Sequence, residues 1–172
     1  MNLIRTGRAA SLAAAALIVL AACEQQPTAS AAAASLSEGD RIASSTPLDV
    51  QEATLTWLIA NKSALNIDAQ CVSTGYPDLD ADPSSLLLDR FAGNKPAVVP
   101  LSGCTVDVSG ITYNATGGLA QWFKLGEPVI TGRTATLPAA MQLNGRLFEG
   151  YACTARLRNV WTVTDCALTT AG

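Results

Sequence analysis

The chain has 172 residues, of which 49% are hydrophobic, and it carries a formal net charge of −3 without a single histidine. This length suffices for one domain with a single hydrophobic core. The acidic balance offers no basic face to neutralise phosphate, so the composition argues against a nucleic-acid partner.

Residues 1–22 have the parts of a secretory signal. Arg5 and Arg8 stand in a short segment without acids, and an almost uninterrupted apolar run covers residues 9–22. A helix that crosses the hydrocarbon core needs about 20 apolar residues, so this run is too short to span a membrane. We therefore expect a signal peptide that is removed from the mature protein.

The apolar run ends in Leu20-Ala21-Ala22-Cys23, which resembles the lipobox of bacterial lipoproteins. The resemblance implies a diacylglycerol thioether on Cys23, cleavage after Ala22 and acylation of the new amino group, for instance with palmitate. Several acyl chains make a stable membrane anchor. In this family an aspartate after the cysteine favours the inner membrane, and here the residue is Glu24. The resemblance therefore implies the periplasmic face of the outer membrane; the alternative is a secreted protein with an ordinary Cys23 thiol.

Residues 23–45 predict a flexible tether, because they lack apolar periodicity and contain almost nothing large to bury. A tether of this length has a root-mean-square span of roughly 25 Å. Without Arg5 and Arg8 the mature chain has 9 basic and 14 acidic residues, a net charge of −5. Residues 46–172 then form a single domain.

A helix is predicted from residue 47 to about residue 61. Thr46 suits the N-cap, Pro47 suits the first helical position, and Asp49 completes a pattern close to a capping box. The apolar residues of this segment form one broad face that we expect to pack on a sheet: Leu48, Val50, Ala53, Leu55, Trp57, Leu58 and Ile59. Trp57 could line a ligand pocket, although a tryptophan on such a face is more often core.

The region from residue 64 to residue 104 is predicted to be irregular. Four of its aspartates have the spacing of ligands 1, 3, 5 and 12 of a calcium loop: Asp78, Asp80, Asp82 and Asp89. Position 6 of such a loop needs glycine, and here it is Pro83, which disfavours calcium. The alternative is a helix that Asp82 caps, that begins at Pro83, and that buries the leucines of 86–88.

Strands are predicted from Thr105 onward. Asn144-Gly145 is typical of a two-residue type I′ hairpin, and a second hairpin is expected at about 158–160. Pro138 marks a bulge or a sheet edge. The predicted strands cover residues 105–113 in two pieces, 119–125, 129–143, 146–157 and 161–168.

The predicted fold class is therefore α+β, with an N-terminal helix packed on a twisted antiparallel sheet that ends in a three-strand meander. This layout, with an Arg-x-Arg-Asn-Val-Trp-x-Val turn over residues 156–163, loosely resembles cystatin-like and nuclear-transport-factor-2-like domains across residues 46–169. It also looks like lipoprotein domains of proteobacteria. Many proteins with this architecture bind a small molecule in the cone between helix and sheet. Its enzymes usually rely on aspartate and histidine, and this chain has no histidine.

With Cys23 lipidated, four cysteines remain, an even number suited to an oxidising compartment. Three connectivities are possible. We prefer Cys153–Cys166, because a hairpin whose paired residue numbers sum to 319 places them directly opposite each other. Cys71–Cys104 would then close the irregular region. No two cysteines have the close spacing of zinc ligands, which disfavours zinc.

The sequence predicts no catalytic site and no cofactor. Without histidine, only a lysine or a carboxylate could activate a nucleophile, and Lys62, Lys95 and Lys124 stand in polar or turn settings. A carboxylate pair of the glycosidase type stays open, since its members can lie far apart in the chain. Most of the acids, however, stand at predicted caps and turns.

One set of residues is a candidate ligand site. A two-residue turn at 144–145 would place Arg133 opposite Arg156, with Arg158 near Trp161. Like charges in directly opposite positions destabilise a strand pair. Asp165, diagonal to Arg156, offers an internal partner. The alternative is an anion or ligand site of Arg133, Arg156 and Arg158, with Trp161 as a stacking plate.

Two functions are consistent with these features. The first is a non-enzymatic, lipid-anchored cell-envelope protein that is attached to the membrane through its anchor and either contacts other envelope proteins or serves a structural role. The second is a small-molecule-binding module with a cone-shaped pocket. A cavity with convergent polar groups would favour the second, and a filled core with an exposed apolar patch would favour the first.

Overall fold

The structure, a computed structural model, describes residues 46–144 and 147–172, which belong to one compact unit. The expected signal peptide, the Leu20-Ala21-Ala22-Cys23 motif and the tether lie outside the described residues. Within them the fold is mixed α+β, with a large sheet, a small sheet, two α-helices and two disulfides. No helix in this part of the chain is long and apolar enough to cross a membrane.

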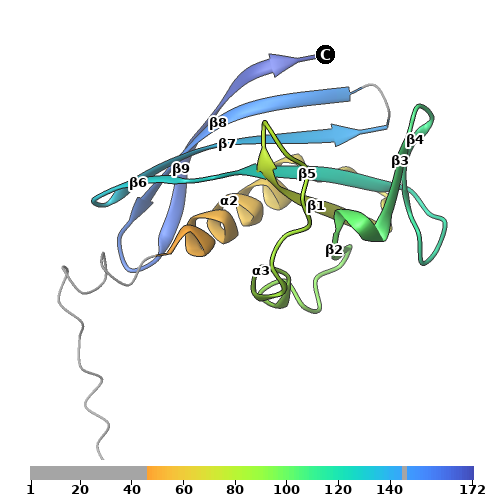
Figure 1. The fold of residues 1–172 in the computed structure, drawn as a ribbon, viewed down its shortest axis with the longest axis horizontal. Helices are drawn as coiled ribbons and strands as arrows, with labels where there is room; N and C mark the ends of the chain where they lie inside the picture. Colours follow the sequence, from red (N-terminus) through yellow and green to blue (C-terminus); the bar gives the residue numbers. More distant parts are fainter. Residues whose placement is uncertain (1–45, 145–146) are drawn as a thin grey trace, which may run out of the picture. The chain divides into compact units, whose positions relative to one another are not determined.

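The elements follow the chain in an order that alternates at first and then becomes all strand (Figure 1). They are α2 (Pro47–Lys62), β1 (Ala69–Tyr76), α3 (Ser85–Asp89), β2 (Ala97–Pro100), the 3₁₀ turn η1 (Leu101–Gly103), β3 (Cys104–Asp107), β4 (Gly110–Tyr113), β5 (Ala120–Gly126), β6 (Val129–Thr131), β7 (Thr134–Leu143), β8 (Leu147–Leu157) and β9 (Trp161–Ala171).

The large sheet is mixed, and the expectation of a wholly antiparallel sheet was wrong. Its strand order is β2-β1-β5-β7-β8-β9, with β6 paired to β7. Strand β1 pairs in parallel with both β2 and β5, and the other pairs are antiparallel. Two strands therefore lie in the region predicted to be irregular. The first five residues of β1 are all buried, so the strand lacks the alternation of apolar and polar residues that would reveal it.

The expected three-strand meander is formed by β7, β8 and β9, but the register between β7 and β8 differs by one residue from the expectation. Leu143 pairs with Leu147, so three residues connect β7 to β8 instead of two. Asn144, the first of them, has a positive φ of 53°. Thr134 consequently faces Arg156, and Arg133 does not. A shift of one residue changes which side chains face each other along the whole pair.

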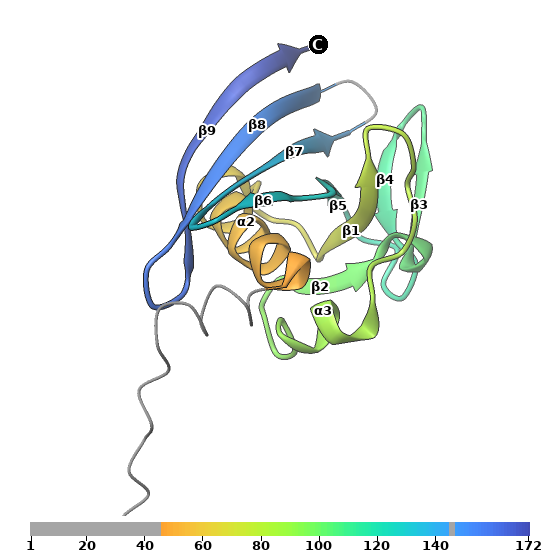
Figure 2. The ribbon, with the colours of Figure 1, turned by 60° about the vertical axis from the view of Figure 1, so that its left-hand side comes forward.

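Helix α2 lies along one face of the sheet (Figures 1 and 2). At its start the backbone N–H of Thr46 donates to Asp49 Oδ2 at 2.8 Å, which satisfies one of the donors at the helix terminus. The main core lies between this helix and strands β1, β5, β7, β8 and β9. Its members include Val50, Leu55, Leu58, Val72, Leu87, Phe123, Leu125, Leu137, Tyr151 and Leu157.

A smaller apolar cluster lies on the opposite face of β1 and β5. It contains Ala69, Cys71, Ile111, Ala120 and Trp122, and the small sheet of β3 and β4 contributes to it. The Cys71–Cys104 disulfide joins β1 to β3 at this place. The second disulfide joins Cys153 to Cys166, which lie directly opposite each other on β8 and β9. Both expected pairings are confirmed.

Helix α3 begins later than expected. Its N-cap is Ser84, whose Oγ accepts the backbone N–H of Leu87 at 3.3 Å, so the predicted cap at Asp82 was wrong. Asp82 instead accepts the backbone N–H of Ser102 at 2.8 Å. Pro83 is buried just ahead of the helix.

Candidate functional site

A groove of about 810 Å³ lies between α2 and the hairpin of β8 and β9. We call it the α2–β9 groove. One wall is formed by Asp49, Glu52, Ala53, Thr56, Trp57, Ala60 and Asn61, and the other by Leu157, Asn159, Val160, Trp161, Thr162 and Val163. Its volume falls within the range of small-molecule sites, about 300–1,000 Å³.

On the helix wall, small side chains along one side of α2 leave the space of the groove unfilled. Positions three and four residues apart share one side of a helix, which places Ala53, Trp57 and Ala60 in one row. The two alanines fill little space against the sheet. Trp57 lies between them and meets the ring of Tyr151 edge to face, with the centroids 6.5 Å apart. The row therefore alternates a large aromatic surface with two shallow positions.

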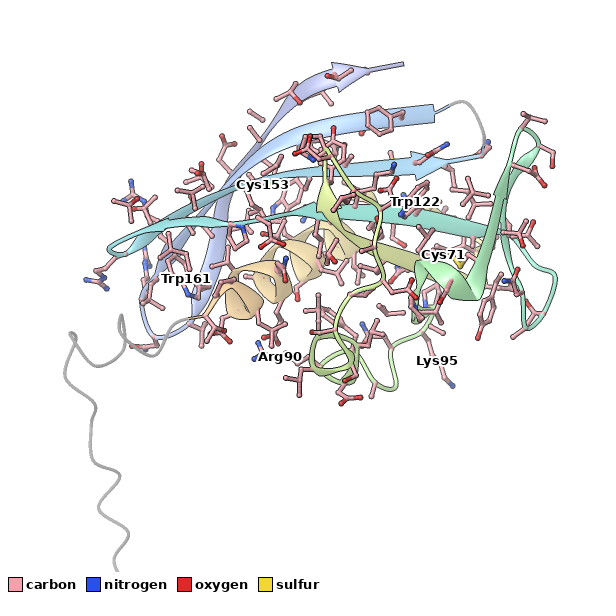
Figure 3. All side chains as sticks on the ribbon, in the orientation of Figure 1. Cys71, Arg90, Lys95, Trp122, Cys153 and Trp161 are labelled. Atoms are coloured by element: carbon pink, nitrogen blue, oxygen red, sulfur yellow. A yellow bond between two sulfur atoms is a disulfide. The ribbon has the colours of Figure 1, made fainter. Side chains whose placement is uncertain are left out.

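Trp161 forms the strand wall and carries an unusual polar group. The residue is only 6% exposed, and its indole N–H has no hydrogen-bond partner within the described residues. Most buried polar groups are paired, and an unpaired donor costs about 1–3 kcal/mol. Trp122 provides a contrast, since its indole N–H donates to Ser73 Oγ at 2.9 Å. Figure 3 shows the two tryptophans at opposite ends of the sheet.

Carboxylates line the groove at the first turns of α2. Arg90 donates to Asp49 Oδ1 at 2.8 Å and also bonds to Glu52, so one guanidinium serves two acids. Burial raises the pKa of Asp49, but the bonds from the Thr46 backbone and Arg90 outweigh it and leave that pKa below its ordinary value. Asp49 is therefore ionised near neutral pH, and this part of the groove keeps an excess negative charge.

The far end of α2 is fixed to β8 by a charged contact. Lys62 Nζ lies 3.6 Å from Glu149 Oε2 and 4.9 Å from the centroid of the Tyr151 ring, and the Tyr151 hydroxyl bonds to Glu149. The bond to Tyr151 raises the pKa of Lys62, and the charge of Glu149 raises it further. Lys62 is thus held as a cation, which makes it unsuited to act as a general base.

The structure separates the candidate arginines from Trp161. Leu157 pairs with Trp161 on the face that carries α2, whereas Arg156 pairs with Thr162 on the opposite face and is exposed. Successive side chains of a strand point to opposite faces, so Trp161 cannot stack above Arg156. Arg158 is exposed in the turn between β8 and β9.

Arg133 and Asp165 also lie in places other than those expected. Arg133 stands opposite Leu157, to whose carbonyl oxygen its Nε donates at 3.0 Å. Asp165 pairs with Thr154, and no ion pair within the described residues joins it to Arg156. The predicted cluster therefore does not assemble, because the register of β7 and β8 differs by one residue.

A second hollow, of about 570 Å³, lies beside Trp122 and Cys104 and includes Asp80 and Asp82. Asp80 accepts Lys124 Nζ at 3.1 Å and Ser73 Oγ at 3.2 Å, while Asp82 is bound to Ser102. No group of three or more potential metal ligands occurs in residues 46–144 or 147–172. Both carboxylates of this hollow thus have hydrogen-bond partners, unlike the indole N–H of Trp161.

Sequence reasoning named Trp57 and Trp161 separately but missed the groove that they share. The available signal was the row of Ala53, Trp57 and Ala60 along one side of the helix, because small residues beside an aromatic leave room. What the sequence could not provide was the partner of this row. The hairpin of β8 and β9 lies about a hundred residues farther along the chain.

Three comparisons with known proteins give no relative for this chain. No family model, no curated protein and no solved structure matches it. The resemblances to bacterial lipoproteins and to cystatin-like or nuclear-transport-factor-2-like domains therefore stay predictions, and function has to be argued from the groove itself.

Proposed function

We propose that the domain is a non-enzymatic binding module whose α2–β9 groove holds a small, mainly apolar molecule with a hydrogen-bond acceptor. The observation that carries this proposal is the buried indole N–H of Trp161, a residue that lines the groove; this N–H has no partner within the described residues. A carbonyl or ether oxygen of a ligand would satisfy this donor. Trp57, Leu157 and Val163 would contact the apolar part of the ligand.

The charge of the groove narrows the class of molecule. Asp49 and Glu52 share the single guanidinium of Arg90, so they repel an anion and tolerate a neutral or cationic ligand. The exposed Arg156 points to the opposite face of the sheet and cannot compensate for them. A neutral or cationic amphiphile therefore suits the groove better than the anion considered from sequence.

We also propose that a lipid on Cys23 anchors the domain at the periplasmic face of the outer membrane. Leu20-Ala21-Ala22-Cys23 closes a segment with the composition of a signal peptide. The other four of the five cysteines form the two disulfides, which suits an exported protein. Labelled palmitate should enter the parent chain and not Cys23→Ala; labelling of both would contradict the anchor.

Ligand binding can be tested by isolating the tagged full chain from membranes, extracting it with organic solvent and identifying the molecules released. The parent should carry one compound, and Ala60→Trp, which fills the groove from the exposed side of α2, should lose it. Trp161→Phe removes the donor together with one ring of the indole, so it should retain roughly five- to tenfold less of the compound.

Trp122→Phe is the matched control, because it makes the same chemical change at the far end of the sheet. It should carry as much of the compound as the parent. Equal recovery from the parent and Ala60→Trp would contradict groove binding. If a second protein co-purified with the parent in equal amount and no small molecule was released, the result would instead support the other candidate function, an interaction role in the cell envelope.

A further inference from the structure

Strand β9 forms a long, open edge of the large sheet. It has 11 residues, and within the described residues it pairs only with β8. Figure 2 shows it as the outermost strand, ending at the C-terminus. The other end of the sheet is β2, which has four residues and ends in Pro100. Short strands and prolines discourage edge pairing, whereas a long edge exposes a row of unpaired N–H and C=O groups.

The register with β8 identifies which backbone groups of β9 point outward. Cys153 and Cys166 are directly opposite, and their Cα atoms are 4.0 Å apart. Such a short separation is typical of a non-hydrogen-bonded antiparallel pair, whose N–H and C=O groups point away from the partner strand. Leu168, two residues farther along, has the same orientation. Both residues thus offer a donor and an acceptor at the free edge.

Two bulges limit the regular part of this edge. Thr164 and Thr169 are left out of the pairing with β8, so between the two bulges the ladder is regular over only four residues, 165–168. A bulge bends and twists a strand, which prevents a long continuous pairing with another edge. Any strand that joins β9 is therefore confined to a short stretch, and a closed pair is favoured over a growing fibril.

We propose that β9 pairs antiparallel with β9 of a second copy of this chain, around a twofold axis at Ala167. In this register Cys166 lies opposite the partner's Leu168, and Leu168 lies opposite the partner's Cys166. Each pair joins two residues whose backbone groups point outward, so four hydrogen bonds form. An axis centred on Cys166 or on Leu168 would bring a bulged residue into the ladder, and only two of these four hydrogen bonds would form.

The side chains are compatible with this register. Leu168 is 56% exposed and pairs with Tyr151, so it stands on the same face as the Cys153–Cys166 disulfide. The twofold places it against the partner's disulfide and removes its apolar surface from water. Asp165 is the sole ionisable residue of β9, and it would face the partner's Thr169 and not a second aspartate. Like charges are thereby kept apart.

Sedimentation of the full chain in excess detergent tests this pairing. The weight-average mass should rise toward that of a dimer with concentration. Leu168→Lys places a charge on the edge, a common protection against pairing, and should weaken association at least tenfold. Thr136→Lys adds the same charge at an exposed position of β7 and should associate like the parent.

Two further measurements separate backbone pairing from other contacts. Leu168→Pro removes one outward N–H without breaking the ladder to β8, so it should also weaken association. Amide exchange should slow with concentration at Cys166 and Leu168, while Ala167, which faces β8, stays protected throughout. A chain that remains monomeric up to millimolar concentration would overturn the proposal, and so would a dimer that Leu168→Lys leaves intact.

Discussion

The indole N–H of Trp122 donates to the hydroxyl of Ser73 at 2.9 Å, across the parallel pair of β5 and β1. Ser73 is fully buried, and its hydroxyl in turn donates to Asp80 Oδ1 at 3.2 Å. Asp80 also binds Lys124 Nζ, which lies 3.7 Å above the Trp122 ring. One serine therefore connects a buried tryptophan to a charged contact at the surface.

Removing that hydroxyl should be costly. Ser73→Ala leaves the buried indole N–H of Trp122 without a partner, so we expect a loss of about 1–3 kcal/mol in the free energy of unfolding, measured with urea. In a Trp122→Phe background the same substitution should cost less, because no donor remains to be stranded. An equal cost in both backgrounds would contradict the stabilising role of this bond.

Gly126 should not tolerate a side chain. A Cβ there would lie 2.5 Å from Pro138 Cγ and 2.6 Å from the carbonyl oxygen of Tyr76. Gly126→Ala should therefore lower the free energy of unfolding by about 1–3 kcal/mol, the usual cost of overpacking. Gly103→Ala is the control, since its nearest contact is Val99 at 3.7 Å, and it should have little effect. Equal melting temperatures for the two variants would contradict the close approach.

The two disulfides should contribute unequally. Cys71 and Cys104 are separated by 33 positions, and Cys153 and Cys166 by 13. In the chain-entropy treatment, replacing the first pair by alanine should cost about 4 kcal/mol and replacing the second about 3 kcal/mol. Urea unfolding of the two double variants measures the difference. A larger loss from the second pair would show that loop length does not govern their contributions.

The Asp49 contact predicts a dependence of stability on acid. Its pKa is lower in the folded chain than the ordinary value of 3.8, so ionised Asp49 stabilises the fold above that value. This contribution should disappear as the pH falls through the folded pKa. Asp49→Asn should therefore show a shallower loss of stability below pH 4 than the parent, by less than about 1 kcal/mol because the site is partly exposed.

Arg90→Met provides the companion measurement for Asp49. It keeps much of the side-chain stem but removes the guanidinium that binds Asp49, while the bond from the Thr46 backbone remains. The slope of stability against pH should then fall between those of the parent and Asp49→Asn. Identical slopes for all three proteins would exclude Asp49 as the source of the acid dependence.

The sequence was informative where the determining contacts are local. Cys153 and Cys166 flank one short hairpin, so a single assumption about its turn was enough to pair them. The register near that turn nevertheless differs from the one at the disulfide, because the bulge at Thr164 shifts it by one residue. The pairing of β7 and β8 was displaced for a similar reason, since Asn144-Gly145 belongs to a three-residue connection.

The sequence was uninformative where distant segments meet. Strand β1 contains Gln70 and Ser73, polar residues that are buried because Ser63 and Trp122 supply partners. Because these polar residues are buried beside apolar ones, β1 lacks the alternation of apolar and polar residues on which strand prediction depends. The groove was hidden for the same reason, because Ala53 and Trp161 become neighbours only through the fold.

The order of strands in the large sheet also determines when the domain can assemble. Helix α2 packs against β5, β8 and β9, and β9 occupies residues 161–171 at the end of the described chain. During synthesis, α2 is therefore made before the three strands against which it packs. A chain terminated after Leu157 would lack the strand that carries Trp161 and Cys166. Such a truncation should abolish the native state as a whole, so we expect that folding cannot be completed before β9 has been made.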